Sequence, residues 1–153
     1  MEILISNKQD DIKIDLLFFK KLAEFTLTFE GIKPLTELSM VFVDEEEIEK
    51  LNFQYREVEE PTDVLSFSLY DKLPQDETEY PLVLGDVVIC PIIAKQNALK
   101  AGCSVGQELN VLLVHGILHL LGYEHNSLDD ERIMMARQKE ILNGFSRSEP
   151  GVK

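Results

Sequence analysis

The stretch of sequence that decides the fold is SVGQELNVLLVHGILHLLGYEH, residues 104–125. Ser104 followed by Gln107 forms a capping box, in which each side chain bonds the other residue's backbone N–H, so a helix is expected to begin there. The apolar run from Val111 to Leu121 is too short to span a membrane and is expected to be a buried helix. Gly122 can adopt a positive φ and end it.

All three histidines of the chain lie in this stretch, as His115, His119 and His125. His115 and His119 are four residues apart, so a helix places both imidazoles on one face, one turn apart. The turn at Gly122 lets His125 approach the same point from another direction. Three neutral imidazoles suit zinc and leave the fourth tetrahedral position to water, as in catalytic zinc sites. The spacing therefore predicts one Zn²⁺ ion bound by these residues, in a hydrolase.

The histidine spacing also resembles the metzincin peptidase signature, H-E-x-x-H-x-x-G-x-x-H. Gly116 stands where that signature has the glutamate that serves as general base, so peptide hydrolysis is the weaker prediction. Glycine inside a helix costs about 1 kcal/mol relative to alanine. Gly116 is therefore expected to make room for a substrate or a neighbouring backbone. A closed structural zinc site is disfavoured too, because no fourth cysteine or histidine lies nearby.

Working outward, strand-like patterns cover residues 2–6, 38–43, 64–69 and 84–90. Helices are expected over residues 14–29, from Asp44 onward with Ile48, Leu51 and Tyr55 on the buried face, from Pro91 to near Gly102, and from Ser127 to near Gly144. An exposed acidic loop is expected over residues 70–81. Because strands prevail early and helices late, we predict an α+β fold: a four-stranded mixed sheet with helices packed mainly on one face.

The 153 residues, with 44% hydrophobic and 28% charged side chains, suit a single domain over residues 1–153. The N-terminus does not resemble a signal peptide, so a cytoplasmic location is expected. A formal net charge of −13 repels nucleic acid at long range, so an RNA-binding role requires a local basic face. The lysines near the N-terminus could supply one: Lys8, Lys13, Lys20, Lys21 and Lys33.

The segment from His115 to His125 resembles the signature of the bacterial YbeY family of rRNA maturation factors, whose members are metal-dependent endoribonucleases. Two further segments are similar to family motifs: Tyr55-Arg56 followed by PTDVLSF at residues 61–67, and LGDVVIC at residues 84–90. The resemblance implies a zincin-like fold, one zinc ion, and cleavage of single-stranded RNA. It also implies a role in 3′-end maturation of 16S rRNA and in ribosome quality control, with small-subunit components as partners, no organic cofactor and no membrane.

The resemblance further implies that Arg56 is a catalytic residue. Its permanently charged guanidinium can bind two phosphate oxygens, which a phosphodiester transition state requires. The alternative is a surface ion pair with Glu57, Glu59 or Glu60.

Several alternatives stay open from sequence. Asp63, Asp86 and Glu124 are equal candidates for a carboxylate that orients a ligand imidazole. The attacking nucleophile is either water or the 2′-hydroxyl of the RNA. A second class of function is a ribosome-assembly factor with little catalysis of its own, and a third is a zinc peptidase.

Overall fold

The computed structural model describes residues 1–70 and 82–148, so the predicted acidic loop lies, apart from Tyr70, outside the described residues. The elements follow in the order β1 (Glu2–Lys8), α1 (Leu16–Phe29), β2 (Thr36–Val43), α2 (Glu45–Arg56), β3 (Val64–Ser68), β4 (Leu82–Ile89), α3 (Pro91–Ala101), α4 (Val105–Leu120) and α5 (Leu128–Ser148).

The four strands form one mixed sheet in the order β1-β2-β4-β3. β1 pairs with β2 and β2 with β4 in parallel, whereas β3 pairs antiparallel with β4. The predicted α+β fold with a four-stranded mixed sheet is confirmed. Because β3 is an edge strand, one of its long sides is left free to line a cleft.

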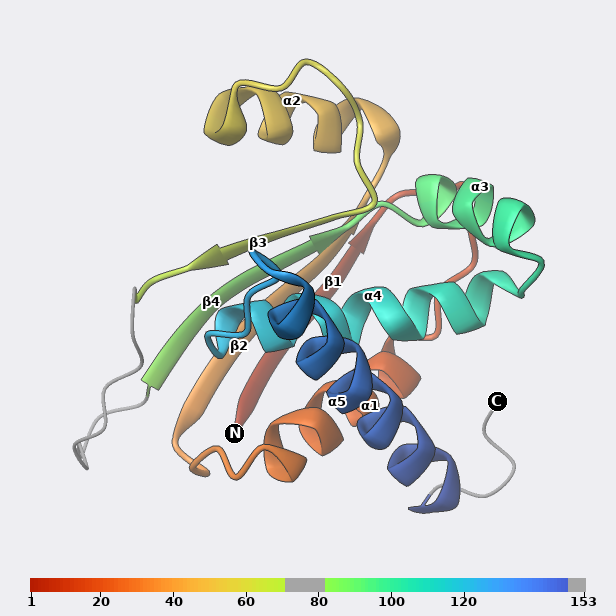
Figure 1. Ribbon diagram of the computed structural model, residues 1–153. Helices are drawn as coiled ribbons and strands as arrows, with labels where there is room; N and C mark the ends of the chain where they lie inside the picture. The colour runs from red at the N-terminus through yellow and green to blue at the C-terminus, as the bar shows by residue number, and fades with distance from the viewer. Residues whose placement is uncertain (71–81, 149–153) are drawn as a thin grey trace.

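Helices cover mainly one face of this sheet (Figure 1). α4 packs on β3 and β4, α1 packs on β1, and α5 lies over α4 and α1 as an outer layer. Strand side chains alternate between the two faces. Leu65 and Val88 therefore point to the opposite face, where they pack against Ile48 of α2.

The ends of α4 are those that the sequence predicts. The Ser104 hydroxyl accepts a hydrogen bond from the Gln107 backbone N–H at 3.1 Å, and the Gln107 side-chain oxygen accepts one from the Ser104 N–H at 3.0 Å. Gly122, just past the helix, has φ +104°, which favours glycine. Local chemistry therefore fixes the helix that carries two of the three histidines.

Two local predictions are wrong. α5 runs through Gly144 to Ser148 and does not end near Gly144. A Cβ at position 144 would lie 3.1 Å from the Phe25 ring of α1, so this glycine serves close packing of the two helices and does not end α5. Tyr55 is 59% exposed rather than buried, since α2 buries itself through Ile48. Within the described ranges, no helix combines the length and apolar character needed to cross a membrane.

Candidate metal centre and cleft

The structure brings the three predicted ligands together. His115 and His119 lie on one face of α4 with their Nε2 atoms 3.0 Å apart. His125 follows the turn at Gly122, and one potential ligand atom from each of the three rings lies within 4.8 Å of the other two. Two nitrogens on a tetrahedral zinc ion with bonds of about 2.0–2.1 Å lie about 3.3 Å apart. The arrangement is thus of the right size for one ion.

Hydrogen bonds on the far sides of two rings set their tautomers. His119 Nδ1 donates to the carbonyl oxygen of Tyr123 at 2.9 Å, and His115 Nδ1 donates to Gln138 Oε1 at 2.8 Å. In the neutral rings the proton is therefore on Nδ1, and each Nε2 carries a lone pair. Two lone pairs this close repel each other unless a cation or a proton lies between them. The donor set therefore fits a bound metal ion.

The environment also keeps two rings neutral. Burial lowers the pKa of His115 below its ordinary value of 6.5, although the hydrogen bond to Gln138 opposes the shift. Burial likewise lowers the pKa of His119, and the neighbouring His115 lowers it further. A metal ligand must be deprotonated. Both imidazoles are consequently in the metal-binding form at neutral pH.

None of the three carboxylates named from sequence bonds a histidine ring within the described part of the chain. Asp63 accepts from Asn97 at 3.1 Å, and Glu124 accepts from Asn126 at 2.9 Å. Asp86 is exposed on the sheet face away from α4. The orienting groups are Gln138 and a backbone carbonyl. Sequence reasoning missed Gln138 because it lies 23 residues from His115 and carries no charge.

Gly116 explains how α4 approaches the sheet. A Cβ at this position would lie 2.7 Å from Val87 Cγ1 and 3.3 Å from Ser66 Oγ. The Ser66 hydroxyl donates to the Gly116 carbonyl at 3.0 Å. The space is therefore filled by side chains of β3 and β4, not by substrate or a neighbouring backbone as predicted. A glutamate at this position would meet the sheet, which is a second argument against the peptidase arrangement.

A cleft of about 790 Å³ opens beside the histidines, and Arg56 lies on its lining. Arg56 is the last residue of α2, and the chain turns away after it because Glu57 adopts the left-handed conformation, with φ 58°. Within residues 1–70 and 82–148 the Arg56 guanidinium makes no ion pair, so the surface pair considered from sequence is absent there. With respect to these described residues, the Arg56 guanidinium is available to bind a ligand.

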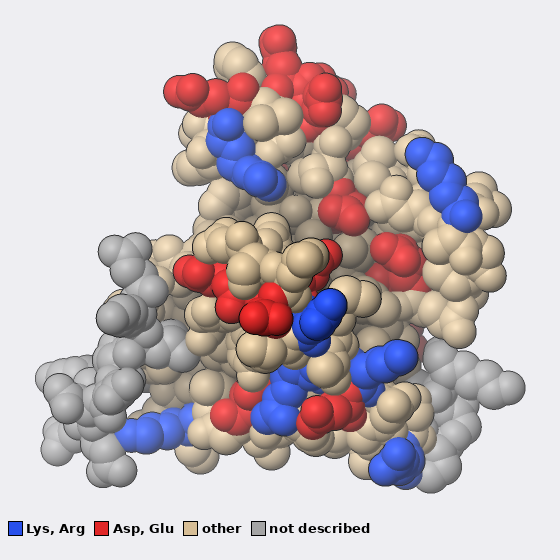
Figure 2. Space-filling view, in the orientation of Figure 1, with Lys and Arg blue, Asp and Glu red and all other residues tan. Residues whose placement is uncertain are grey.

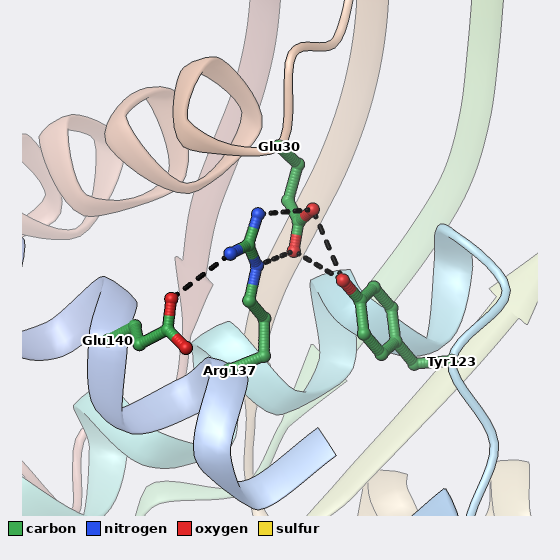
Figure 3. A network of polar contacts seen from close by, with 4 residues as sticks. All are labelled: Glu30, Tyr123, Arg137 and Glu140. Carbon is green, nitrogen blue, oxygen red and sulfur yellow. Dashed lines mark hydrogen bonds and ion pairs between the residues drawn. The ribbon is translucent and has the colours of Figure 1, made fainter. Parts of the chain in front are cut away.

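A polar network holds the loop between α4 and His125 (Figure 3). The Tyr123 hydroxyl donates to Glu30 at 2.9 Å, and Arg137 Nε donates to the same carboxylate at 3.0 Å. Arg137 also donates to Glu140 at 3.1 Å. The network joins the end of α1, the loop and α5, and so fixes the Tyr123 carbonyl that orients His119.

Comparison with known proteins identifies the family. Residues 4–146 match the family model described as Endoribonuclease YbeY. The chain belongs to the YbeY family. Named members include Endoribonuclease YbeY of Clavibacter sepedonicus, which is 40% identical over 147 residues, covering 95% of this chain and 96% of the relative. That of Acidothermus cellulolyticus is 44% identical over 151 residues, covering 95% and 92%.

A solved structure agrees. The solution structure of a Thermotoga maritima protein has 28% sequence identity and a TM-score of 0.62, covering 99% of each chain. The resemblance to the YbeY family predicted from the histidine segment and its companion motifs is thereby confirmed, and with it the class of enzyme, an endoribonuclease.

Proposed function

We propose that this chain is a single metal-dependent endoribonuclease domain that cleaves single-stranded RNA with one zinc ion, in 3′-end maturation of 16S rRNA and in ribosome quality control. The observation that carries the proposal is the convergence of three imidazoles in a cleft that Arg56 also lines, with no ion pair to Arg56 among the described residues. The proposed partners are rRNA and small-subunit components in the cytoplasm, without an organic cofactor or a membrane; family membership supports them.

His115, His119 and His125 would hold the zinc ion. When bound, zinc would supply a Lewis acid for activating water and for polarising a phosphate oxygen. The protein contributes orientation, because Gln138 and the Tyr123 carbonyl hold the rings of His115 and His119 in place. These rings therefore lose little conformational freedom when the metal binds.

Arg56 would bind the scissile phosphate. A guanidinium can donate two parallel hydrogen bonds to phosphate oxygens and stabilise the charge that builds up in the transition state. Among residues 1–70 and 82–148, Arg56 has no ion pair that would have to break first. The ends of the products identify the nucleophile, because a 2′,3′-cyclic phosphate arises from the 2′-hydroxyl and excludes direct attack by water.

The test combines elemental analysis with an RNA-cleavage assay on the wild-type protein and two variants. We expect about one zinc per wild-type chain, loss of both zinc and cleavage in His119→Ala, and loss of cleavage with retained zinc in Arg56→Ala. Full cleavage by metal-free His119→Ala protein would overturn the proposal.

The net charge of −13 favours a second candidate, a ribosome-assembly factor with little catalysis. It predicts that His115→Ala protein loses metal yet retains ribosome binding and cellular function. A zinc peptidase is the weakest candidate and predicts cleavage of casein, which we do not expect from a site without the glutamate base.

A further inference from the structure

Tyr55 presents an aromatic ring on the lining of the cleft, directly before Arg56 in the last turn of α2. Its ring centroid lies 4.9 Å from that of Phe67 on β3, with the two planes at 59°. Tyr55 is nevertheless 59% exposed. Contact with Phe67 restricts the ring on one side, while most of its surface stays open to solvent.

The residues around the Tyr55 ring offer little positive charge, so they favour contact with an uncharged part of a ligand over contact with a further negatively charged part. Among the described residues that line the cleft, Arg56 is the only lysine or arginine, and Asp63 and Glu124 are acidic. None of the five N-terminal lysines considered from sequence is among them. Figure 2 shows acidic side chains gathered over α2. The protein therefore supplies little long-range attraction for the phosphate backbone here, because that attraction comes from lysine and arginine side chains.

Stacking between a base and an aromatic ring does not depend on a net positive charge, and every base offers a π face. A ring held by a neighbour also loses little side-chain entropy when a ligand binds. Bases of a duplex are already stacked, so only an unpaired base can use such a surface.

We propose that Tyr55, supported by Phe67, is a stacking platform for one unpaired base of the RNA whose phosphate binds Arg56. The inference rests on the proposed function and adds to it a binding subsite for a nucleobase. The adjacency of Tyr55 and Arg56 explains how base and backbone of one strand would be held together at the metal centre.

Phe53 supplies a matched control on the same helix. It is 54% exposed, close to the value for Tyr55, but it lines a separate depression with Glu46 and Lys50. Two residues apart on a helix correspond to a rotation of about 200°, so the two rings point in opposite directions.

The chain contains no tryptophan, so Tyr55→Trp and Phe53→Trp each introduce a single fluorescent reporter. Both are titrated with a 2′-O-methylated single-stranded RNA hexamer, verified to stay intact, and with an abasic hexamer of the same backbone. We expect the hexamer with bases to quench the reporter at 55 and not at 53, and the abasic hexamer to quench neither. Equal quenching at both positions, or by both hexamers, would overturn the proposal.

Cleavage kinetics distinguish failure of the stacking platform from failure of the proposed endoribonuclease function. Tyr55→Leu is expected to raise KM for single-stranded RNA about tenfold with little change in kcat, and Tyr55→Phe, which keeps an aromatic ring, is expected to raise KM much less. The control variant Phe53→Leu should stay near wild type. If wild-type protein cleaves RNA and Tyr55→Leu matches Phe53→Leu, the platform is rejected while the proposed function stands. If wild-type protein neither binds nor cleaves RNA, both are rejected.

Discussion

The two walls of the cleft differ in how they are held. On the α4 wall, His115 and His119 are each fixed by a hydrogen bond on Nδ1. On the α2 wall, Tyr55 is mostly exposed and the Arg56 guanidinium has no ion-pair partner in the described ranges. A metal centre needs ligands held to within a fraction of an ångström, whereas a substrate needs side chains with unused binding capacity. We infer that one wall is built for the ion and the other for RNA.

The sharpest test of this division is Arg56→Ala. Losing one preorganised group that stabilises transition-state charge lowers kcat by about 10²- to 10³-fold in comparable cases, and we expect that range here. Zinc content should be unchanged, because within the described ranges no hydrogen bond or ion pair joins Arg56 to the three histidines. The kcat of Arg56→Lys should lie between those of the wild type and Arg56→Ala, since lysine keeps the charge but cannot donate two parallel hydrogen bonds. Reduced zinc in either variant would show that the walls are coupled.

Gln138→Leu tests the opposite wall. Removing the group that orients a metal-bound histidine typically costs about 10- to 100-fold in metal affinity, which competition with a chromophoric chelator would measure. Gln138→Glu, which keeps an acceptor for His115 Nδ1, is the control and should bind zinc at least as well as the wild type. Equal affinity in Gln138→Leu would mean that the hydrogen bond does not position the ring.

Gly116→Ala tests whether α4 depends on its close approach to the sheet. The added methyl group would meet Val87 Cγ1 at 2.7 Å, and overpacking of this kind costs about 1–3 kcal/mol. The gain in helix propensity, about 1 kcal/mol, offsets part of it. We expect a net loss of about 1 kcal/mol in the free energy of unfolding by urea.

The control for that variant lies on the same helix. The φ of Gly106 lies outside the left-handed region, and among the described residues an added Cβ would meet Ser104 Oγ alone within 4 Å, at 3.9 Å. Gly106→Ala should therefore raise the free energy of unfolding by about 0.4–1 kcal/mol. If both alanine variants shift stability in the same direction, contact with the sheet is not what requires glycine at 116.

Tyr123→Phe tests the polar network that holds the loop before His125. It removes the hydrogen bond to Glu30 at 2.9 Å but leaves that carboxylate paired with Arg137, so we expect a loss of about 1 kcal/mol in stability. Zinc affinity should fall less than in Gln138→Leu, because the Tyr123 carbonyl itself remains. A larger loss of affinity than in Gln138→Leu would make the Glu30 network the main support of the histidine wall.

The sequence by itself determined what depends on neighbours within a few turns of chain. A capping box begins α4, the four-residue spacing puts His115 and His119 on one face, and Gly122 ends the helix. The same periodicities predicted four strands and the α+β class. These features could be predicted because hydrogen bonding and side-chain direction within one element follow from residue spacing alone.

Only the tertiary structure decided what joins distant segments. β4 lies between β2 and β3, α5 brings Gln138 to His115 across 23 residues, and Arg56 lines the cleft beside the histidines. The exposure of Tyr55 was likewise hidden, because a helical pattern shows which residues share a face but not what covers that face. Such pairings depend on packing between elements, whose geometry no local pattern records.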